Sequence, residues 1–395
     1  MKFASRLVSF DVAPGDQHRP MATPIYQTAT FEQEEATRFG AYDYSRSGNP
    51  TRAVLEEQIS LLENGTHGFC FSSGMAAIST VARLLRTGDE ILADSDLYGG
   101  TCRLFTRILE RSGITVRYAD AGDPGAFAAQ TSALTKLIYV ESPTNPLLRV
   151  IDLRRIATIA HERGALLAVD NSAMSPYLQN PLDLGADIVL HSATKYLCGH
   201  SDVTAGVVVV KDPALADQIY FVQNAEGNAL GPFDSFLFLR GLKTLKLRLD
   251  AQQQNAQAVA EFLQAHPLVR GVNYPGLTSS AGYELQKEQA RGAGAVLSFT
   301  SGSPELSSRF VEATRIFSIC VSFGSINSTI SLPGCMSHAS VPPEVGALRD
   351  LPPDLIRLSV GIEDAGDLIA DLEQAFACCD APTVSAVVEN DTLVA

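Results

Sequence analysis

Short apolar runs alternate with helical patterns through residues 60–210. Apolar residues fill successive positions of each run, which is typical of strands buried on both faces of a parallel sheet. Between the runs, stretches such as 76–85 place Ile78, Val81 and Leu85 on one helical face. Strands that alternate with helices predict an α/β domain with a mostly parallel sheet of seven strands. The predicted strands are 68–71, 91–93, 114–118, 137–140, 166–169, 188–190 and 206–210.

The pattern changes on either side of this region. Residues 1–45 contain frequent Pro and Gly and predict an irregular arm. Such an arm must pack against another part of the protein or against a neighbouring subunit. Residues 233–266 have few helix breakers and are expected to be helical. A smaller α+β unit follows, with predicted strands 296–300, 316–321 and 356–360 and a last helix at 365–377. We therefore predict an arm (1–45), an α/β domain (46–240), an α+β domain (241–380) and a tail (381–395) without regular structure.

Composition excludes several classes of protein. The chain has 395 residues, 46% of them hydrophobic and 19% charged, as in an ordinary globular enzyme of two or three domains. A formal net charge of −14 argues against a nucleic-acid partner, because phosphate contacts need clustered Lys and Arg. No apolar run reaches the roughly 18 residues of a membrane helix, and the start has no apolar signal core. These features predict a cytoplasmic protein without a membrane or nucleic-acid partner.

Cysteine and histidine spacing suggests no metal. The seven cysteines contain no CxxC pair, which favours reduced thiols, although disulfide or metal roles remain alternatives. The seven histidines form neither HExxH nor another paired spacing. We therefore predict that the chain has no metal site.

Two of the predicted strands lead into chemically active residues. The run 165–169 ends in Asp170, and the run 188–190 is followed by Lys195. Pyridoxal phosphate chemistry needs this pair, because a Lys forms a Schiff base with the aldehyde and an acid keeps the pyridine nitrogen protonated. A single Lys after a strand would more often be a solvated surface charge.

Two further segments suit a phosphate group. Residues 72–77, SSGMAA, join a strand to a helix, and small residues there let backbone amides approach an anion, although plain capping explains them equally well. Tyr44 and Arg46 lie in a turn-rich segment that suits a phosphate clamp or, alternatively, a surface loop. Ser192 and Thr194 flank Lys195 with hydroxyl groups that can complete such a site.

Other polar residues follow strands or interrupt them. Tyr98 can stack on a flat ring or belong to the core. Asn145 follows a strand and can donate a hydrogen bond to a ring oxygen or a carboxylate. Arg357 interrupts the apolar strand 355–360, where a buried charge requires a partner. That partner is either a substrate carboxylate or an acidic side chain of the protein.

With these segments in order, the chain closely resembles the Cys/Met-metabolism family of pyridoxal phosphate enzymes, which have fold type I, the aspartate aminotransferase-like fold. The resemblance covers nearly the whole chain. It rests on YSRSGNPTR (44–52), SSGMAA (72–77), DLYGGT (96–101), ESPTNP (141–146), VDNS (169–172), HSATKYLCGHSD (191–202), GPFDSFLFLRGLKT (231–244) and LIRLSVGIED (355–364).

The resemblance implies a role for each matching residue. Lys195 would be the Schiff-base lysine and the base, Asp170 the partner of the pyridinium nitrogen, and Tyr98 the stacking ring and an aid to catalysis. Gly74, Met75, Ser192 and Thr194 would bind the cofactor phosphate. Tyr44 and Arg46 would reach it from a neighbouring subunit, which implies a homo-oligomer, a tetramer built from dimers that share active sites. Arg357, Asn145 and Ser322, with Tyr44, would bind the amino-acid substrate.

Within the family, the segment from Ser322 to Ser340 and the stretch 170–176 look like those of plant-type cystathionine β-lyases. Gly100 stands where methionine γ-lyases typically carry Cys, and Asn327 stands where γ-enzymes often carry Glu. The resemblance therefore favours β-elimination of L-cystathionine in methionine biosynthesis. A γ-synthase or γ-lyase acting at Cγ is the alternative, and a binding protein with a vestigial site is a third reading.

Overall fold

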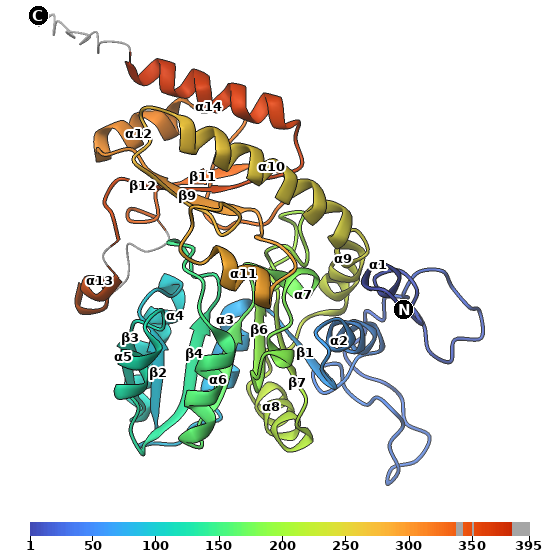
Figure 1. The fold of residues 1–395 in the computed structure, drawn as a ribbon. Helices are drawn as coiled ribbons and strands as arrows, with labels where there is room; N and C mark the ends of the chain where they lie inside the picture. The colour runs from blue at the N-terminus through green and yellow to red at the C-terminus, as the bar shows by residue number, and fades with distance from the viewer. Residues whose placement is uncertain (337–342, 350, 381–395) are drawn as a thin grey trace, which may run out of the picture.

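Within residues 1–336, 343–349 and 351–380, which the computed structural model describes, the larger domain is built on a seven-stranded sheet (Figure 1). The strand order is β1-β7-β6-β5-β4-β2-β3, and β7 runs antiparallel to both of its neighbours, whereas the other pairs are parallel. The strands are β1 His67–Phe71, β2 Glu90–Asp94, β3 Thr115–Ala119, β4 Thr135–Glu141, β5 Leu166–Asp170, β6 Ile188–Ser192 and β7 Gly206–Val210.

Helices cover both faces of this sheet, as the continuous apolar runs predict. Ile138 and Val140 of β4 pack into one core with α2, α5 and α6, whereas Leu137 and Tyr139 pack into a second core with α3, α4 and α8. The helices of this domain are α2 Pro50–Leu62, α3 Gly74–Ala82, α4 Gly99–Leu104, α5 Pro124–Ala129, α6 Leu153–Glu162, α7 Ser175–Leu178, α8 Pro213–Glu226 and α9 Pro232–Leu242. Because side chains alternate between faces, Asp170 and Ser192 project toward the side of α3.

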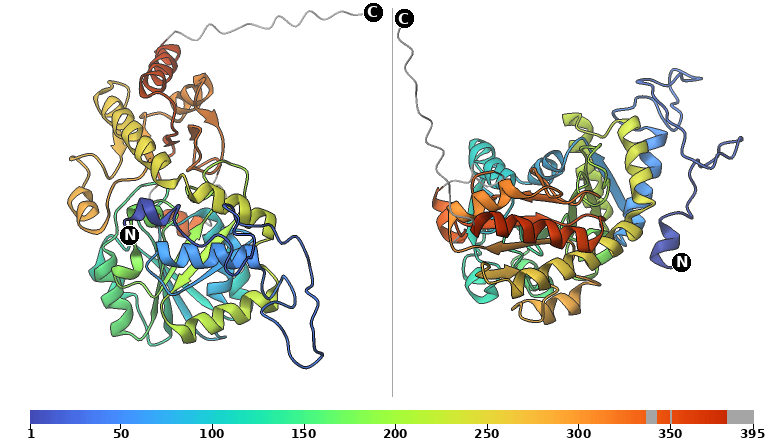
Figure 2. Two further views of the ribbon diagram at one scale, coloured as in Figure 1. Left: turned by 90° about the vertical axis from the view of Figure 1, so that its right-hand side faces the viewer. Right: turned by 90° about the horizontal axis from the view of Figure 1, so that it is seen from above.

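A smaller domain with a second sheet follows (Figures 1 and 2). The sheet has the order β10-β11-β12-β9-β8. Phe299 of the sheet packs against Phe310 and Phe376, which lie on helices that cover it. Its strands are β8 Gly271–Asn273, β9 Val296–Thr300, β10 Ser318–Ile319, β11 Thr329–Ser331 and β12 Leu355–Ser359. Its helices are α10 Leu245–Ala265, α11 Tyr283–Gln289, α12 Pro304–Ala313 and α14 Ala365–Asp380. The helix α13 Pro343–Arg349 instead lies beside β3 of the larger domain, and Val345 joins the core there (Figure 1). The predicted fold class, α/β with a smaller α+β domain, is confirmed.

Two predicted elements differ from the structure. The helical stretch predicted at 233–266 is two helices, because the Arg248 guanidinium turns back and donates to the Gly241 carbonyl at 3.0 Å. The strand predicted at 316–321 is only Ser318–Ile319. There the backbone amides that precede the strand, those of residues 315–317, donate to the Asp371 carboxylate instead of to a neighbouring strand.

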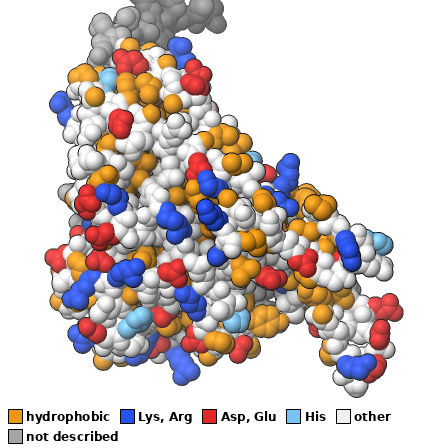
Figure 3. Space-filling model, turned by 45° about the vertical axis from the view of Figure 1, so that its right-hand side comes forward, with side chains coloured by type: hydrophobic (Ala, Val, Ile, Leu, Met, Phe, Trp, Pro, Cys, Tyr) orange, Lys and Arg blue, Asp and Glu red, His pale blue; other side chains and the backbone are white. Residues whose placement is uncertain are grey.

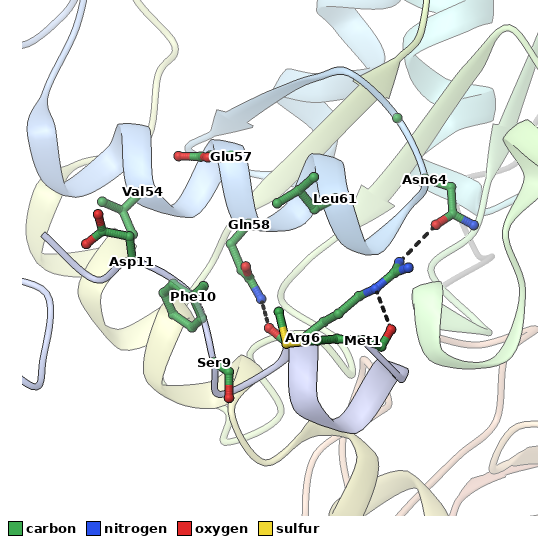
Figure 4. Close-up of a pocket in the computed structure, with 11 residues that line it drawn as sticks. Met1, Arg6, Ser9, Phe10, Asp11, Val54, Glu57, Gln58, Leu61 and Asn64 are labelled. Carbon is green, nitrogen blue, oxygen red and sulfur yellow. Dashed lines mark hydrogen bonds between the residues drawn. The ribbon is translucent and has the colours of Figure 1, made fainter. Parts of the chain in front are cut away.

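The N-terminal arm is largely irregular, as predicted, apart from the short helix α1 Phe3–Arg6. This helix rests against α2, where Gln58 donates to the Arg6 carbonyl at 2.5 Å and Arg6 donates to Asn64 at 3.3 Å (Figure 4). A cavity of about 510 Å³ lies between the two segments. The rest of the arm projects away from the larger domain (Figure 2).

The predicted domain boundaries stay predictions, and the tail at 381–395 lies outside the described residues. In the described part of the chain, no helix combines the length and the apolar character that a membrane span requires. The same residues bring no group of three or more His, Cys, Asp or Glu side chains together as possible metal ligands.

Candidate active site

A cavity of about 490 Å³ lies between the two domains, beyond the ends of β4, β5 and β6. It is no larger than the cavity beside α1, so its side chains rather than its size mark it as the candidate site. The cavity brings together most of the predicted site residues: Lys195, Asp170, Tyr98, Gly74, Met75, Ser192, Thr194, Asn145, Ser322 and Arg357.

Lys195 lies in the turn after β6, and its ammonium donates to the Ser322 hydroxyl at 2.5 Å. Burial, reinforced by the charge of Arg357, lowers the pKa of Lys195 to about 8. A considerable fraction of this amine is therefore neutral near physiological pH. A neutral amine is the form that attacks a carbonyl carbon or accepts a proton.

Asp170 is the last residue of β5 and lies almost fully buried at the edge of the cavity. The Ser172 amide donates to Asp170 Oδ1 at 2.9 Å, which fixes one carboxylate oxygen. A carboxylate in this position can keep a heteroaromatic nitrogen protonated, because its negative charge raises the pKa of that nitrogen.

The N-terminus of α3 forms a cradle for an anion. Ser73 caps the helix by accepting from the Ala76 amide at 3.1 Å, while the amides of Gly74 and Met75 precede any intrahelical acceptor. A Cβ atom at Gly74 would lie 2.8 Å from Ser192 Cβ, so only glycine lets Ser192 approach the helix end so closely. Phosphate suits such a terminus, because the helix dipole and the free amides both favour negative charge.

Thr194 completes this wall of the cavity, with its hydroxyl accepting from the Ala205 amide at 3.1 Å. An amine, a carboxylate and an anion cradle thus surround one cavity. Pyridoxal 5′-phosphate carries an aldehyde, a ring nitrogen and a phosphate, so the residues present fit this cofactor.

Tyr98 lies at the start of α4, is 38% exposed and lines the cavity. Its amide donates to Glu141 Oε1 at 2.9 Å, which anchors the backbone to the end of β4. A Cβ atom at Gly100 would lie only 2.4 Å from Tyr98 Cε1. The absence of a side chain at Gly100 therefore allows the ring to lie where it does.

We expect Gly100→Ala to displace the Tyr98 ring and to lower kcat about tenfold, since overpacking of this kind typically costs about 1–3 kcal/mol. Weaker cofactor binding by the apoprotein should accompany the loss. Gly231→Ala is the matched control, because no atom lies within 4 Å of a Cβ at that position. Wild-type kcat and cofactor affinity in Gly100→Ala would show that the ring position does not matter.

Arg357 of β12 approaches the cavity from the smaller domain and is 3% exposed. It donates to Asn145 Oδ1 at 2.9 Å and to the Ser322 carbonyl at 2.8 Å. No ion pair of Arg357 occurs within the described part of the chain. A structural ion pair therefore does not explain its burial, and its guanidinium remains available for a substrate carboxylate.

A strained turn at residues 322–324 contacts both Lys195 and Arg357. Ser322 adopts φ +82° and Gly324 φ +85°, and the former conformation costs a non-glycine residue about 1–3 kcal/mol. The turn places the Phe323 ring 5.1 Å from Lys195 Nζ and 5.7 Å from Arg357 Cζ, measured to the ring centroid. One aromatic ring therefore contacts both cationic groups of the site.

The single chain does not bring Tyr44 and Arg46 into this cavity. Arg46 donates to the backbone and side-chain oxygens of Asn224 on α8, and Tyr44 is 42% exposed. Conversely, Glu141, Arg103 and Phe323 line the cavity although no role was predicted for them. Glu141 lies in a recognised motif, and Arg103 stands on the helix that Tyr98 begins, so both carried a signal in the sequence.

Comparison with known proteins agrees with this site. The family model of the Cys/Met metabolism PLP-dependent enzymes matches residues 4–377. The chloroplastic cystathionine β-lyase of Arabidopsis thaliana is 52% identical over 361 residues, which are 91% of this chain and 78% of that protein. The cystathionine γ-lyase of Bacillus subtilis is 45% identical over 95% of this chain and 99% of its own length.

Solved structures agree as well. The cystathionine γ-lyase of Lactobacillus plantarum, solved in complex with L-serine, superimposes with a TM-score of 0.93 at 42% identity. That similarity covers 97% of this chain and all of the other. The fold is accordingly that of the fold-type I trans-sulfuration enzymes, and the cofactor is pyridoxal phosphate. The chain belongs to the family of Cys/Met metabolism PLP-dependent enzymes.

Proposed function

We propose that this chain is a cystathionine β-lyase, which cleaves L-cystathionine with water to homocysteine, pyruvate and ammonia and serves methionine biosynthesis. The observation that carries the proposal is the convergence of Lys195, Asp170 and Arg357 on one cavity between the domains. An intact set of amine, carboxylate and carboxylate-binding guanidinium also argues against a vestigial site.

The residues divide the work as follows. Arg357 and Asn145 bind the α-carboxylate of the substrate and so orient its Cα–H bond toward Lys195. When bound, pyridoxal phosphate supplies an electron sink for the negative charge that develops at Cα. Asp170 holds the proton on the ring nitrogen, and the α3 terminus with Ser192 binds the phosphate.

Lys195 then acts as the base. Its neutral amine removes the Cα proton, and the hydrogen bond to the Ser322 hydroxyl fixes the position of the amine in the cavity. Loss of the Cα proton allows the bond between Cβ and sulfur to break, and the sulfur leaves as homocysteine. A γ-enzyme must in addition remove a proton from Cβ, which requires the Lys195 amine to reach Cβ as well as Cα.

The segment 322–327 supports β-elimination rather than reaction at Cγ. Asn327 stands where, by the resemblance, the γ-enzymes of the family often carry Glu. The similarity to plant β-lyases in this segment points the same way. Residues 337–342 of the predicted plant-like segment lie outside the described residues.

A γ-lyase or γ-synthase is the second candidate, because cystathionine γ-lyases are among the proteins to which this chain is similar.

Proton exchange separates the two candidates. The enzyme is incubated in D2O with L-2-aminobutyrate, which has no leaving group, and deuterium is followed by NMR. We expect exchange at Cα alone. Comparable exchange at Cβ would favour a γ-enzyme, and Lys195→Ala should exchange neither position.

We also propose that the enzyme is a homo-oligomer whose active sites are completed by Tyr44 and Arg46 of a neighbouring subunit. Hydrophobic side chains are visible on the surface of the projecting arm (Figure 3). Among the large apolar residues of the arm, Met21 is 93% exposed and Phe39 is 66% exposed. An apolar surface of this kind suits contact with a second copy of the chain.

Mixing two inactive variants tests this arrangement. In a mixed dimer of Arg46→Ala and Lys195→Ala, one of the two sites contains both intact residues. Statistical exchange should therefore restore about a quarter of the wild-type activity, since half of the dimers are mixed. If verified subunit exchange restores nothing, each site is built from one chain.

A further inference from the structure

Three side chains at the ends of β4 and β5 face the same side of the sheet. Glu141 and Asp170 are directly paired in register, and Tyr139 precedes Glu141 by two residues. The Tyr139 hydroxyl donates to Asp170 Oδ2 at 3.2 Å. Tyr139 itself does not line the cavity, and the mechanism above does not use it.

The Tyr139 phenol is held rigidly. Its ring is fully buried in the core beneath α3 and α4 and packs edge-to-face on Phe105, with 5.4 Å between centroids. Burial, reinforced by the neighbouring Asp170 carboxylate, raises the pKa of Tyr139 well above its ordinary value. The hydroxyl therefore keeps its proton and remains a hydrogen-bond donor throughout the working pH range.

Both oxygens of the Asp170 carboxylate thus have a fixed donor. The Ser172 amide holds Oδ1 and the Tyr139 hydroxyl holds Oδ2. Burial and the neighbouring Asp170 carboxylate raise the pKa of Glu141 well above its usual range.

We propose that Tyr139 is a positioning residue that fixes the rotation of the Asp170 carboxylate, so that this group meets the ring nitrogen of the cofactor in one orientation. The inference rests on the role proposed above for Asp170. A donor on only one oxygen would restrain the rotation of the carboxylate about its Cβ–Cγ bond less tightly, and the carboxylate would be aligned with the nitrogen for less of the time.

Tyr139→Phe removes the hydroxyl and keeps the ring. We expect the apoprotein to bind pyridoxal phosphate about tenfold more weakly and kcat to fall about tenfold, while the KM for substrate changes less than about twofold. Tyr274→Phe is the matched control, because Tyr274 is also a buried phenol and donates to the Gly294 carbonyl at 3.0 Å, within the smaller domain. The control should lose stability to a similar extent but keep kcat and cofactor affinity.

A double-mutant cycle with Asp170→Asn shows whether Tyr139 acts through Asp170. In that background Tyr139→Phe should have no further effect on cofactor affinity, whereas additive losses would overturn the inference. If Tyr139→Phe keeps wild-type cofactor affinity and kcat while Asp170→Asn is impaired, the role of Tyr139 is refuted and the role of Asp170 stands. Near-normal behaviour of Asp170→Asn would instead refute the proposed site. Should Tyr139→Phe fail to fold while Tyr274→Phe folds, Tyr139 would be structural and the inference wrong.

Discussion

Replacement of Lys195 by alanine should abolish turnover, with a loss of about a thousandfold or more in kcat. The variant loses both the amine that attaches the cofactor and the base that removes the Cα proton, and each function contributes orders of magnitude. The visible absorbance of the lysine-bound cofactor should disappear with the activity. The melting temperature of the apoprotein should change little, because among the residues that the structure describes the ammonium donates a hydrogen bond only to the Ser322 hydroxyl.

Lys211→Ala is the matched control for this prediction. Lys211 follows β7 at the opposite end of the sheet, is about half exposed and pairs with Asp183 at 3.1 Å, outside the cavity. The control should retain full activity and the cofactor absorbance. Wild-type turnover by Lys195→Ala would contradict the mechanism.

The pH dependence of cofactor attachment follows from the same residue. Because burial lowers the pKa of Lys195 to about 8, its neutral form predominates above that pH. The rate at which the apoprotein attaches pyridoxal phosphate should therefore rise through pH 8 and then level off. A rate that still climbs toward pH 10.5, the value of an ordinary lysine, would mean that the amine is not desolvated.

Replacement of Asp170 by alanine should lower kcat about a hundredfold or more. Without the carboxylate the ring nitrogen loses its proton, and an unprotonated pyridine is a poor electron sink. Some cofactor should remain bound, since the α3 terminus and Lys195 are unchanged. Steady-state kinetics and the absorbance spectrum measure the two effects separately.

Asp183→Ala removes a carboxylate from the rim of the same domain, where Asp183 contacts Asn64 and Lys211. It should leave kcat unchanged. Near-normal turnover by Asp170→Ala would remove Asp170 from the role proposed for it, and with it the basis of the role of Tyr139.

The sheet and the main site residues were predictable because their signals are local. The continuous apolar runs specify strands covered on both faces, and parallel strands place their carboxyl ends at one edge of the sheet. Asp170 and Lys195 each follow such a run, so their convergence could be expected. Arg357 could be recognised because a charge inside an apolar strand requires a partner.

The features that were missed depend on contacts between distant segments. The break between α9 and α10 arises from Arg248, which donates to a carbonyl seven residues earlier in the chain, and no periodicity reveals that bond. The position of Phe323 depends on the left-handed turn at Ser322 and Gly324, which packs against Tyr196. Tyr139 looked like one more apolar position of β4, because its hydroxyl has meaning only once β5 lies beside it.

The product formed from L-cystathionine distinguishes β-elimination from a reaction at Cγ. Binding of the cysteine-derived end at Arg357 places sulfur on Cβ, whereas binding of the homocysteine-derived end places it on Cγ. A difference of only about 1.4 kcal/mol between the two modes biases the products tenfold. The purified enzyme with pyridoxal phosphate is incubated with L-cystathionine, and the keto acids are separated by chromatography. We expect pyruvate together with homocysteine. If 2-oxobutyrate and cysteine are the main products, the enzyme acts at Cγ and is not a β-lyase.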